Sequence, residues 1–260
     1  MDVLIHETAV ISPSAKIAPS VSIGPYAIIE GNVVIEDDVV IGNHCVITGN
    51  TEIGAGCQFF TGAVIGSAPQ DKKHVGGKNS FLKIGTKNVF REYVTVNCGT
   101  EEGGGQTIIG NRNLFMAYSH VAHDCKIGND CVIANLGTLA GHVTLEDRAI
   151  IGGLSGVHQF VRIGTMSIVG GCSKVVQDVP PYSMCDGDPS KVFGVNIVGL
   201  KRGQFEQSTI STLRKAFKIL FHSGLSKTHA IEKVQKDLGS TTELEYLIGF
   251  IRGSERGVCG

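Results

Sequence analysis

Residues 21–56 read VSIGPY-AIIEGN-VVIEDD-VVIGNH-CVITGN-TEIGAG, six consecutive hexads that all carry isoleucine in the third position. The first position of each hexad holds a small or β-branched residue. Residues two apart share one face of a strand, so both positions point inward and the residues after them form a corner. The stretch therefore predicts one short strand and one corner per hexad, a three-sided prism with about 18 residues per coil.

The repeat continues well beyond this stretch. Stepping by six, the inward apolar position recurs from residue 5 to 65, from 84 to 96 and from 109 to 175, with phenylalanine at 59, 90 and 115 and aliphatic residues elsewhere. The two breaks predict loops that leave the prism near 67–82 and 100–107, and such insertions often gather on the binding face of a solenoid. We therefore predict an all-β domain over residues 1–181, a parallel β-helix of about nine stacked coils with an aliphatic core.

The composition fits this architecture. The chain has 260 residues, of which 35 are glycine and only 6% are aromatic, and ten glycines directly follow an inward aliphatic residue. We assign these glycines to prism corners that need unusual backbone angles. A small inward position is taken by Cys45, Cys57, Cys125 and Cys131. We expect these cysteines to act as compact apolar side chains, not as disulfides or zinc ligands.

Charge and hydropathy exclude several protein classes. With 42% hydrophobic and 18% charged residues, the chain is too apolar to be disordered. A net charge of −1 gives no reason to expect a nucleic-acid partner. No basic segment precedes an apolar run at the N-terminus, and no stretch approaches the about 18 apolar residues of a membrane span. We expect a cytoplasmic protein without an integral membrane segment.

The repeat ends at a pair of prolines at 180 and 181, which cannot extend a hydrogen-bonded ladder. An extended linker is expected over residues 182–203. Beyond it, apolar residues at helical spacing predict an amphipathic helix, which begins a small helical domain over residues 204–260. Ser226 is expected to open a second helix, and Ser240 with Glu243 is a capping signal for a third.

The repeat also places a group of histidines. A coil of about 18 residues puts corner 122–124 beneath corner 140–142, which lies beneath corner 158–160. These corners and the strand before the first of them carry outward polar side chains on one edge of the prism: His120, His123, Asp124, His142, His158 and Gln159. Such a cluster favours a site. Three histidines could hold zinc with one position open, or one histidine could act as a general base beside groups that bind a substrate.

Four motifs resemble one enzyme family, three of them at these corners and one in the segment after the repeat. HVAHDCKIGN (120–129), LAGHV (139–143), GVHQFVRIG (156–164) and FGVNIVGLKR (193–202) are similar to the UDP-N-acetylglucosamine O-acyltransferases that begin lipid A assembly. The resemblance implies a left-handed β-helix and a homotrimer with active sites in clefts between subunits. It also implies transfer of an (R)-3-hydroxyacyl chain from acyl carrier protein to the 3-hydroxyl of UDP-GlcNAc, with no metal and no dissociable cofactor.

The resemblance also implies roles for individual residues. His123 would take the proton from the sugar hydroxyl, Asp124 would orient the ring, and the backbone N–H of Gly141 would stabilise the oxyanion. Positions that match substrate-contacting residues of the family are Gln70, Asp71, Lys73, His120, His142, His158, Gln159, Asn196 and Arg202. Gly171 and Ile168 lie where the family measures acyl length against the neighbouring subunit.

Alternatives stay open at this point. The same cleft could acylate a 3-amino analogue of UDP-GlcNAc, a trimeric γ-type carbonic anhydrase uses three histidines on zinc with the same repeat, and a structural solenoid would need no site. Two departures also matter: Val198 stands where many relatives have Glu, and Gly203 where they have a second Arg. The second change weakens an implied carrier-protein patch, for which Arg214, Lys215 and Lys218 could compensate.

Overall fold

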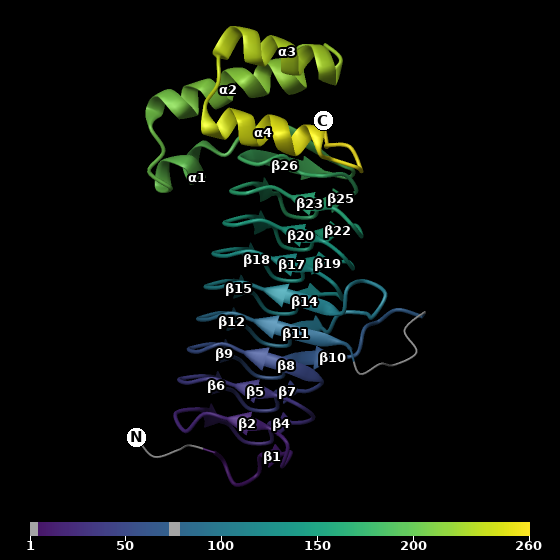
Figure 1. The fold of residues 1–260 in the computed structure, drawn as a ribbon. Helices are drawn as coiled ribbons and strands as arrows, with labels where there is room; N and C mark the ends of the chain where they lie inside the picture. The colour runs from purple at the N-terminus through teal and green to yellow at the C-terminus, as the bar shows by residue number, and fades with distance from the viewer. Residues whose placement is uncertain (1–4, 73–78) are drawn as a thin grey trace.

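The computed structural model describes residues 5–72 and 79–260, which form a left-handed parallel β-helix with a group of helices on one end (Figure 1). Each coil adds one short strand to each of three parallel sheets, as the hexads predict. Lys73, one of the expected substrate-binding residues, lies outside the described residues.

The strands fall into three sheets, called I, II and III here in the order in which a coil visits them. Sheet I contains β1 (Val10–Ile11), β4 (Ile28–Ile29), β7 (Val46–Ile47), β10 (Val64–Ser67), β13 (Thr95–Asn97), β16 (His120–Val121), β19 (Thr138–Leu139), β22 (Gly156–Val157) and β25 (Lys174–Val175). Sheet II contains β2 (Lys16–Ile17), β5 (Val34–Ile35), β8 (Asn50–Ile53), β11 (Phe81–Ile84), β14 (Gln106–Ile109), β17 (Lys126–Ile127), β20 (Thr144–Leu145) and β23 (Arg162–Ile163). Sheet III contains β3 (Ser22–Ile23), β6 (Val40–Ile41), β9 (Gln58–Phe59), β12 (Val89–Phe90), β15 (Leu114–Phe115), β18 (Val132–Ile133), β21 (Ile150–Ile151), β24 (Ile168–Val169), β26 (Ser183–Gly187) and β27 (Ser190–Val195).

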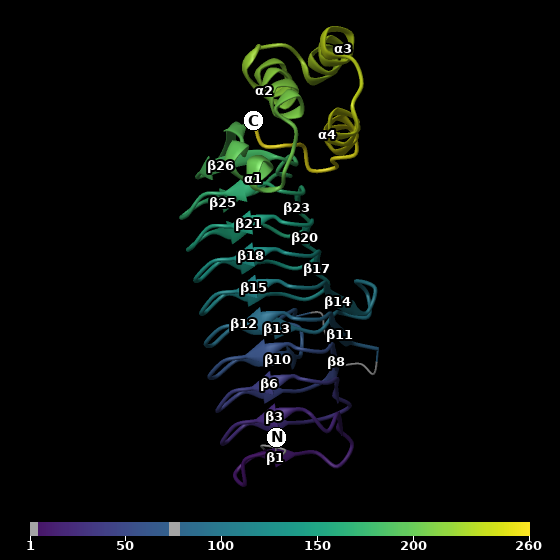
Figure 2. The ribbon, with the colours of Figure 1, turned by 90° about the vertical axis from the view of Figure 1, so that its left-hand side faces the viewer.

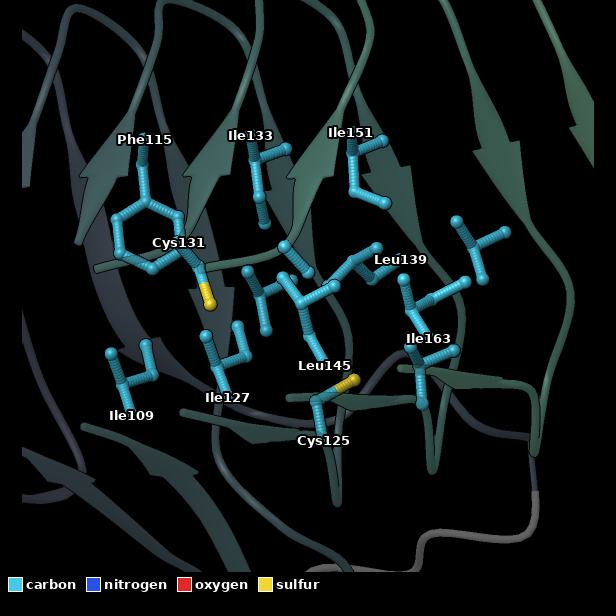
Figure 3. Close-up of a cluster of buried hydrophobic side chains, with 14 of the residues drawn as sticks. Ile109, Phe115, Cys125, Ile127, Cys131, Ile133, Leu139, Leu145, Ile151 and Ile163 are labelled. Atoms are coloured by element: carbon cyan, nitrogen blue, oxygen red, sulfur yellow. The ribbon is translucent and has the colours of Figure 1, made fainter. Parts of the chain in front are cut away.

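The core is a stack of side chains from the inward position. Successive coils are in register, so that Val121 of β16 lies beside Leu139 of β19, which lies beside Val157 of β22. Figure 3 shows this packing, with Ile133 and Ile151 following one another along the prism. Full burial of each such side chain stabilises the fold by about 1.5–3 kcal/mol, so the repeated aliphatics supply a core with few aromatics.

The inward cysteines behave as predicted. Cys45, Cys57 and Cys125 are fully buried and Cys131 nearly so, and all four thiols are free. The Cys125 thiol donates to the carbonyl oxygen of Ala140 at 3.2 Å, in the next coil. Burial raises the pKa of Cys125 to about 12, which keeps this thiol protonated and inert.

The corner glycines have a different role from the one expected. Gly110 has an ordinary φ, but a Cβ on it would lie 2.5 Å from the carbonyl oxygen of Gly128 in the next coil. The left-handed conformation occurs two residues later, on residues with side chains such as Arg112 (φ 56°) and Arg148 (φ 59°). Stacked coils are only about 4.8 Å apart. Most of these glycines are therefore required by the close approach of the next coil, and Gly66 (φ 84°) is an exception.

Residues 182–203 are not the extended linker that the sequence suggests. β26 pairs in parallel with β24 and antiparallel with β27, and α1 (Ile197–Arg202) follows the hairpin. Val192 and Val195 of β27 are buried. Without this hairpin the apolar core of the last coil would face water, so the segment closes the end of the prism.

Three further helices, α2 (Gln207–His222), α3 (Lys227–Leu238) and α4 (Thr242–Arg252), lie over that closed end (Figure 2). Ser226 caps α3 as predicted, whereas α4 is capped by Thr241 and not by Ser240. The tail returns to the prism, where the Sγ atoms of Cys259 and Cys185 lie 3.3 Å apart. Among the described residues, no helix is long and apolar enough to cross a bilayer.

Candidate active site

Both insertions leave the prism at the edge between sheets I and II. The first follows β10 and the second follows β13, strands that pair with each other in sheet I (Figure 1). The Asn97 side chain at the start of the second insertion donates to the Ala68 carbonyl in the first, at 3.1 Å. The next coil carries His123 at the same edge. The insertions therefore gather where the histidines lie.

The predicted stacking of the three histidine corners is confirmed. The His142 N–H donates to the His123 carbonyl, and the Phe160 N–H to the Gly141 carbonyl, at 3.0 and 3.1 Å. Asp124, His142 and Phe160 share the left-handed position of this corner, with φ of 60°, 61° and 67°. The period of the repeat thus brings these side chains into one column.

Ring contacts fix the column further. The rings of His123 and His142 meet edge to face with centroids 5.2 Å apart, and the Phe160 ring stacks on His142 at 4.5 Å. Phe160 is still 51% exposed, so it gives the site an apolar outer wall. Burial lowers the pKa of His142, opposed in part by the carboxylates of Asp124 and Asp71. His142 therefore favours its neutral form.

The centre of the site is a buried histidine–carboxylate pair. His123 Nδ1 lies 2.8 Å from Asp124 Oδ2, and the two side chains are only 9% and 1% exposed. The Asp124 carboxylate also accepts the N–H and the hydroxyl of Thr100, at 2.9 and 2.7 Å. Because Asp124 Oδ2 accepts from His123, the pair holds the imidazole as the tautomer with its proton on Nδ1. Nε2 is then free to accept a proton.

Two glycines bring backbone against this pair. A Cβ on Gly141 would lie 2.5 Å from His123 Cε1, and a Cβ on Gly103 would overlap Asp124 Oδ2. The Gly141 N–H donates to no acceptor among residues 5–72 and 79–260. Such an N–H beside a general base is suited to stabilise an oxyanion.

The remaining histidines lie near the pair with different partners. His120 is half-buried on β16, with Nδ1 2.7 Å from Thr95 Oγ1, and burial lowers its pKa. His158 is exposed one coil beyond His142, and its Nδ1 lies 3.3 Å from an Arg256 guanidinium nitrogen. Gln159 beside it is half-buried. Gln70 is exposed on the first insertion.

The other predicted site residues lie elsewhere on this protomer. Asn196, Arg202 and Ile168 line a cavity of about 550 Å³ between α1 and sheet III. Asn196 is buried, where its side chain accepts the Gly199 N–H at 2.9 Å and donates to the Met166 carbonyl at 2.8 Å. Gly171 is exposed at the edge between sheets III and I. Within the single chain, these residues therefore lie apart from the histidine edge.

The side chains at this edge also allow a test of the alternative that the site binds zinc. Ligand atoms of His123, Asp124 and His142 lie within 4.8 Å of one another. This group holds two histidines and a carboxylate, and neither His120 nor His158 belongs to it. His123 Nδ1 and both Asp124 oxygens already have hydrogen-bond partners. The arrangement fits a hydrogen-bonded base better than a three-histidine zinc site.

Several residues around the pair were missed by sequence reasoning. Thr100 and Gly103 lie in the second insertion, whose path the repeat does not set, although its glycine run marked it as unusual. Thr107 accepts the Asp124 N–H at 2.8 Å from a fully buried inward position. Arg256 is distant in sequence from His158, and no motif joins them. Phe160 lies in a predicted corner, of which only the polar residues were predicted to belong to the site.

Comparison with known proteins gives the family. A family model described as "Udp N-acetylglucosamine O-acyltransferase; Domain 2" matches residues 178–259, and a model of six bacterial transferase hexapeptides matches 106–141. The chain is 50% identical over 255 residues to the acyl-[acyl-carrier-protein]–UDP-N-acetylglucosamine O-acyltransferase of Thermodesulfovibrio yellowstonii, covering 98% of each chain.

Solved structures agree over the whole length. The UDP-N-acetylglucosamine acyltransferase of Bacteroides fragilis superposes with a TM-score of 0.96 at 40% identity, covering 99% of this chain and all of that one. The Acinetobacter baumannii structure gives 0.94 at 41% identity with the same coverage. Because these matches are to acyltransferases, they argue against the alternatives of a carbonic anhydrase and a structural solenoid. The chain belongs to the acyl-[acyl-carrier-protein]–UDP-N-acetylglucosamine O-acyltransferase family.

Proposed function

We propose that the chain moves an (R)-3-hydroxyacyl group from acyl carrier protein to the 3-hydroxyl of UDP-GlcNAc, in lipid A biosynthesis, with His123 as the general base. The observation that carries this proposal is the buried His123–Asp124 pair at 2.8 Å, with Gly141 against the imidazole ring. The family match supports the reaction class, and the geometry supports the assignment of roles.

The reaction follows from that geometry. His123 Nε2 takes the proton of the sugar 3-hydroxyl while the oxygen attacks the thioester carbonyl carbon. The Gly141 N–H stabilises the oxyanion, which is worth about 2.7–4 kcal/mol for one such donor. The intermediate then collapses, the carbon–sulfur bond breaks, and the imidazolium returns its proton to the departing thiolate. A positioned base contributes roughly 10²–10⁴-fold to such a step.

The separation of predicted residues within one protomer supports an assembly. His123 and His142 lie at the edge between sheets I and II, whereas Asn196, Arg202 and Ile168 line the cavity between α1 and sheet III. If both groups contact one substrate, they come from different copies. A homotrimer places the histidine edge of one protomer beside the sheet III cavity of its neighbour. In this arrangement Gly171 and Ile168 border the acyl chain.

A basic surface suits the carrier protein. The side chains of Lys201, Arg202, Arg214, Lys215 and Lys218 are exposed on α1 and α2. Exposed cations attract an anionic partner and raise its association rate, most strongly at low ionic strength. We assign this surface to acyl carrier protein. No cofactor takes part in this reaction.

The decisive experiment incubates the purified enzyme with UDP-GlcNAc or its 3-amino analogue and a series of 3-hydroxyacyl carrier proteins. We expect O-acylated UDP-GlcNAc as the main product, identified by mass spectrometry and by the position of the acyl group in the NMR spectrum. Faster turnover of the 3-amino analogue would instead establish an N-acyltransferase. Near-stoichiometric zinc in the active protein, with activity lost on its removal, would overturn the metal-free mechanism.

A further inference from the structure

The second insertion holds the catalytic carboxylate, through Thr100. Its N–H donates to Asp124 Oδ1 at 2.9 Å and its hydroxyl to Oδ2 at 2.7 Å. His123 Nδ1 shares Oδ2 with that hydroxyl at 2.8 Å, and His142 Nε2 lies 3.6 Å from the same oxygen. Thr100 and Asp124 are both buried, at 7% and 4% exposure. One residue from outside the repeat therefore supplies donors to both oxygens of the carboxylate.

The direction of the Thr100 hydroxyl is fixed by a turn. The Gly103 N–H donates to Thr100 Oγ1 at 3.0 Å, and the Gly105 N–H donates to the Thr100 carbonyl at 2.7 Å. With one lone pair used by Gly103, the hydroxyl hydrogen points to Asp124 Oδ2. The lack of a side chain on Gly103 lets this turn close over the carboxylate, because a Cβ there would overlap Oδ2.

The insertion is itself anchored, so it can act as a rigid support. Ser80 donates its hydroxyl to the Gly99 carbonyl at 2.6 Å, and the Phe81 N–H donates to the Gly105 carbonyl at 2.8 Å. From the opposite side, Thr107 accepts the Asp124 N–H at 2.8 Å. Asp124 is thus held by its backbone from the prism core and by its carboxylate from the insertion.

We propose that Thr100 is a positioning residue that sets both the orientation and the proton affinity of the His123–Asp124 pair. The inference rests on the proposed role of His123 as the base. A donor on Oδ2 stabilises the carboxylate anion and competes for the lone pairs that bind His123 Nδ1–H. Without the hydroxyl, Asp124 attracts that proton more strongly and the imidazolium form of His123 becomes more stable. The base is then neutral only at higher pH.

The test compares Thr100→Val with Thr100→Ser, in full-length enzyme with both substrates. Valine keeps the amide hydrogen bond and removes only the hydroxyl. We expect Thr100→Val to lower kcat about tenfold, the order of effect for a hydrogen bond to a charged group, with little change in the KM for UDP-GlcNAc. We also expect the acidic limb of the kcat/KM profile to move to higher pH. Thr100→Ser should restore both kcat and the pH profile.

Thr51→Val is the matched control, because Thr51 is fully buried and donates its hydroxyl to the Thr48 carbonyl at 2.6 Å, away from the pair. It should keep the wild-type kcat and pH profile. Gly103→Ala supplies a second route. Its Cβ would overlap the Asp124 carboxylate and approach His142 Cε1, so the turn must move away from Asp124 while the Thr100 hydroxyl is kept. It should lower kcat as Thr100→Val does, and it decides the matter if Thr100→Val does not fold.

The outcomes separate this inference from the proposed function. Wild-type kcat and pH profile in Thr100→Val would overturn it, as would an equal loss in Thr51→Val. If Thr100→Val does not fold, wild-type kcat and pH profile in Gly103→Ala would overturn it. Inactive His123→Ala with fully active Thr100→Val refutes only the positioning role. Active His123→Ala refutes the proposed base, and with it this inference.

Discussion

Gly141 lies against the His123 ring, so closely that a Cβ there would come within 2.5 Å of Cε1 and 2.7 Å of Nε2. Its φ is not in the left-handed region, so the backbone angle does not call for glycine. The contact does. Glycine at 141 lets the imidazole remain beside Asp124 and next to the residue whose N–H is proposed to stabilise the oxyanion.

Gly141→Ala is therefore expected to lower kcat by roughly 10²-fold, the effect of a displacement of about 1 Å at a reacting group. The methyl group must push the His123 ring away from its place. Circular dichroism and size-exclusion chromatography should show an unchanged fold and assembly. Gly249→Ala is the control, because a Cβ at Gly249 in α4 meets nothing within 4 Å. Equal kcat in the two variants would contradict the prediction.

His123→Ala is expected to remove nearly all acyl transfer while the proposed homotrimer stays intact. The side chain is nearly buried beside Asp124, and a positioned base is worth roughly 10²–10⁴-fold. The measurement is the rate of product formation with saturating substrates, together with the mass in solution. His229→Ala, an exposed change on α3, should leave the rate unchanged. More than about a tenth of the wild-type rate in His123→Ala would remove His123 from the role of base.

The sequence predicts the prism and the column of corners because the hexad period is constant. Once Val121 and Leu139 are known to point inward, the positions of His123 and His142 follow without further information. Thr100 could not be found in this way, since its insertion has no period and its partner Asp124 is 24 residues away. The hairpin β26–β27 could not be predicted either. It is needed to cover the core of the last coil, and no local sequence pattern indicates that need.

The predicted role of the corner glycines is also wrong, because it depends on the neighbouring coil. We expect Gly110→Ala to lower the free energy of unfolding by about 1–3 kcal/mol, as overpacking does, although its φ is ordinary. Lys87→Gly, at a left-handed corner position (φ 56°), should change it by less than about 1 kcal/mol. Urea unfolding of both variants checks this. A larger loss of unfolding free energy in Lys87→Gly than in Gly110→Ala would instead show that backbone angles decide where glycine is required.

Asn196 is expected to matter more for stability than for substrate binding. It caps α1 and donates to the Met166 carbonyl from a buried position. Asn196→Ala should cost about 1–2 kcal/mol, the range for a lost N-cap, and lower the melting temperature, with a smaller effect on the KM for UDP-GlcNAc. Thermal unfolding and steady-state kinetics give the two values. A large rise in KM at unchanged melting temperature would instead support the substrate contact implied by the family resemblance.

The lowered pKa values of His120 and His142 lead to a prediction of how the stability of the fold depends on pH. Burial causes both shifts, so at a pH just below about 6.5, the ordinary value for histidine, the unfolded chain binds more protons than the folded one. Stability should then fall as the pH drops from about 6.5 through the lowered folded values, and level off below them. Thermal unfolding between pH 7.5 and 5 measures this, and His120→Asn should show a smaller fall. An NMR titration in which both Cε1–H signals have midpoints at or above 6.5 would contradict the assignment.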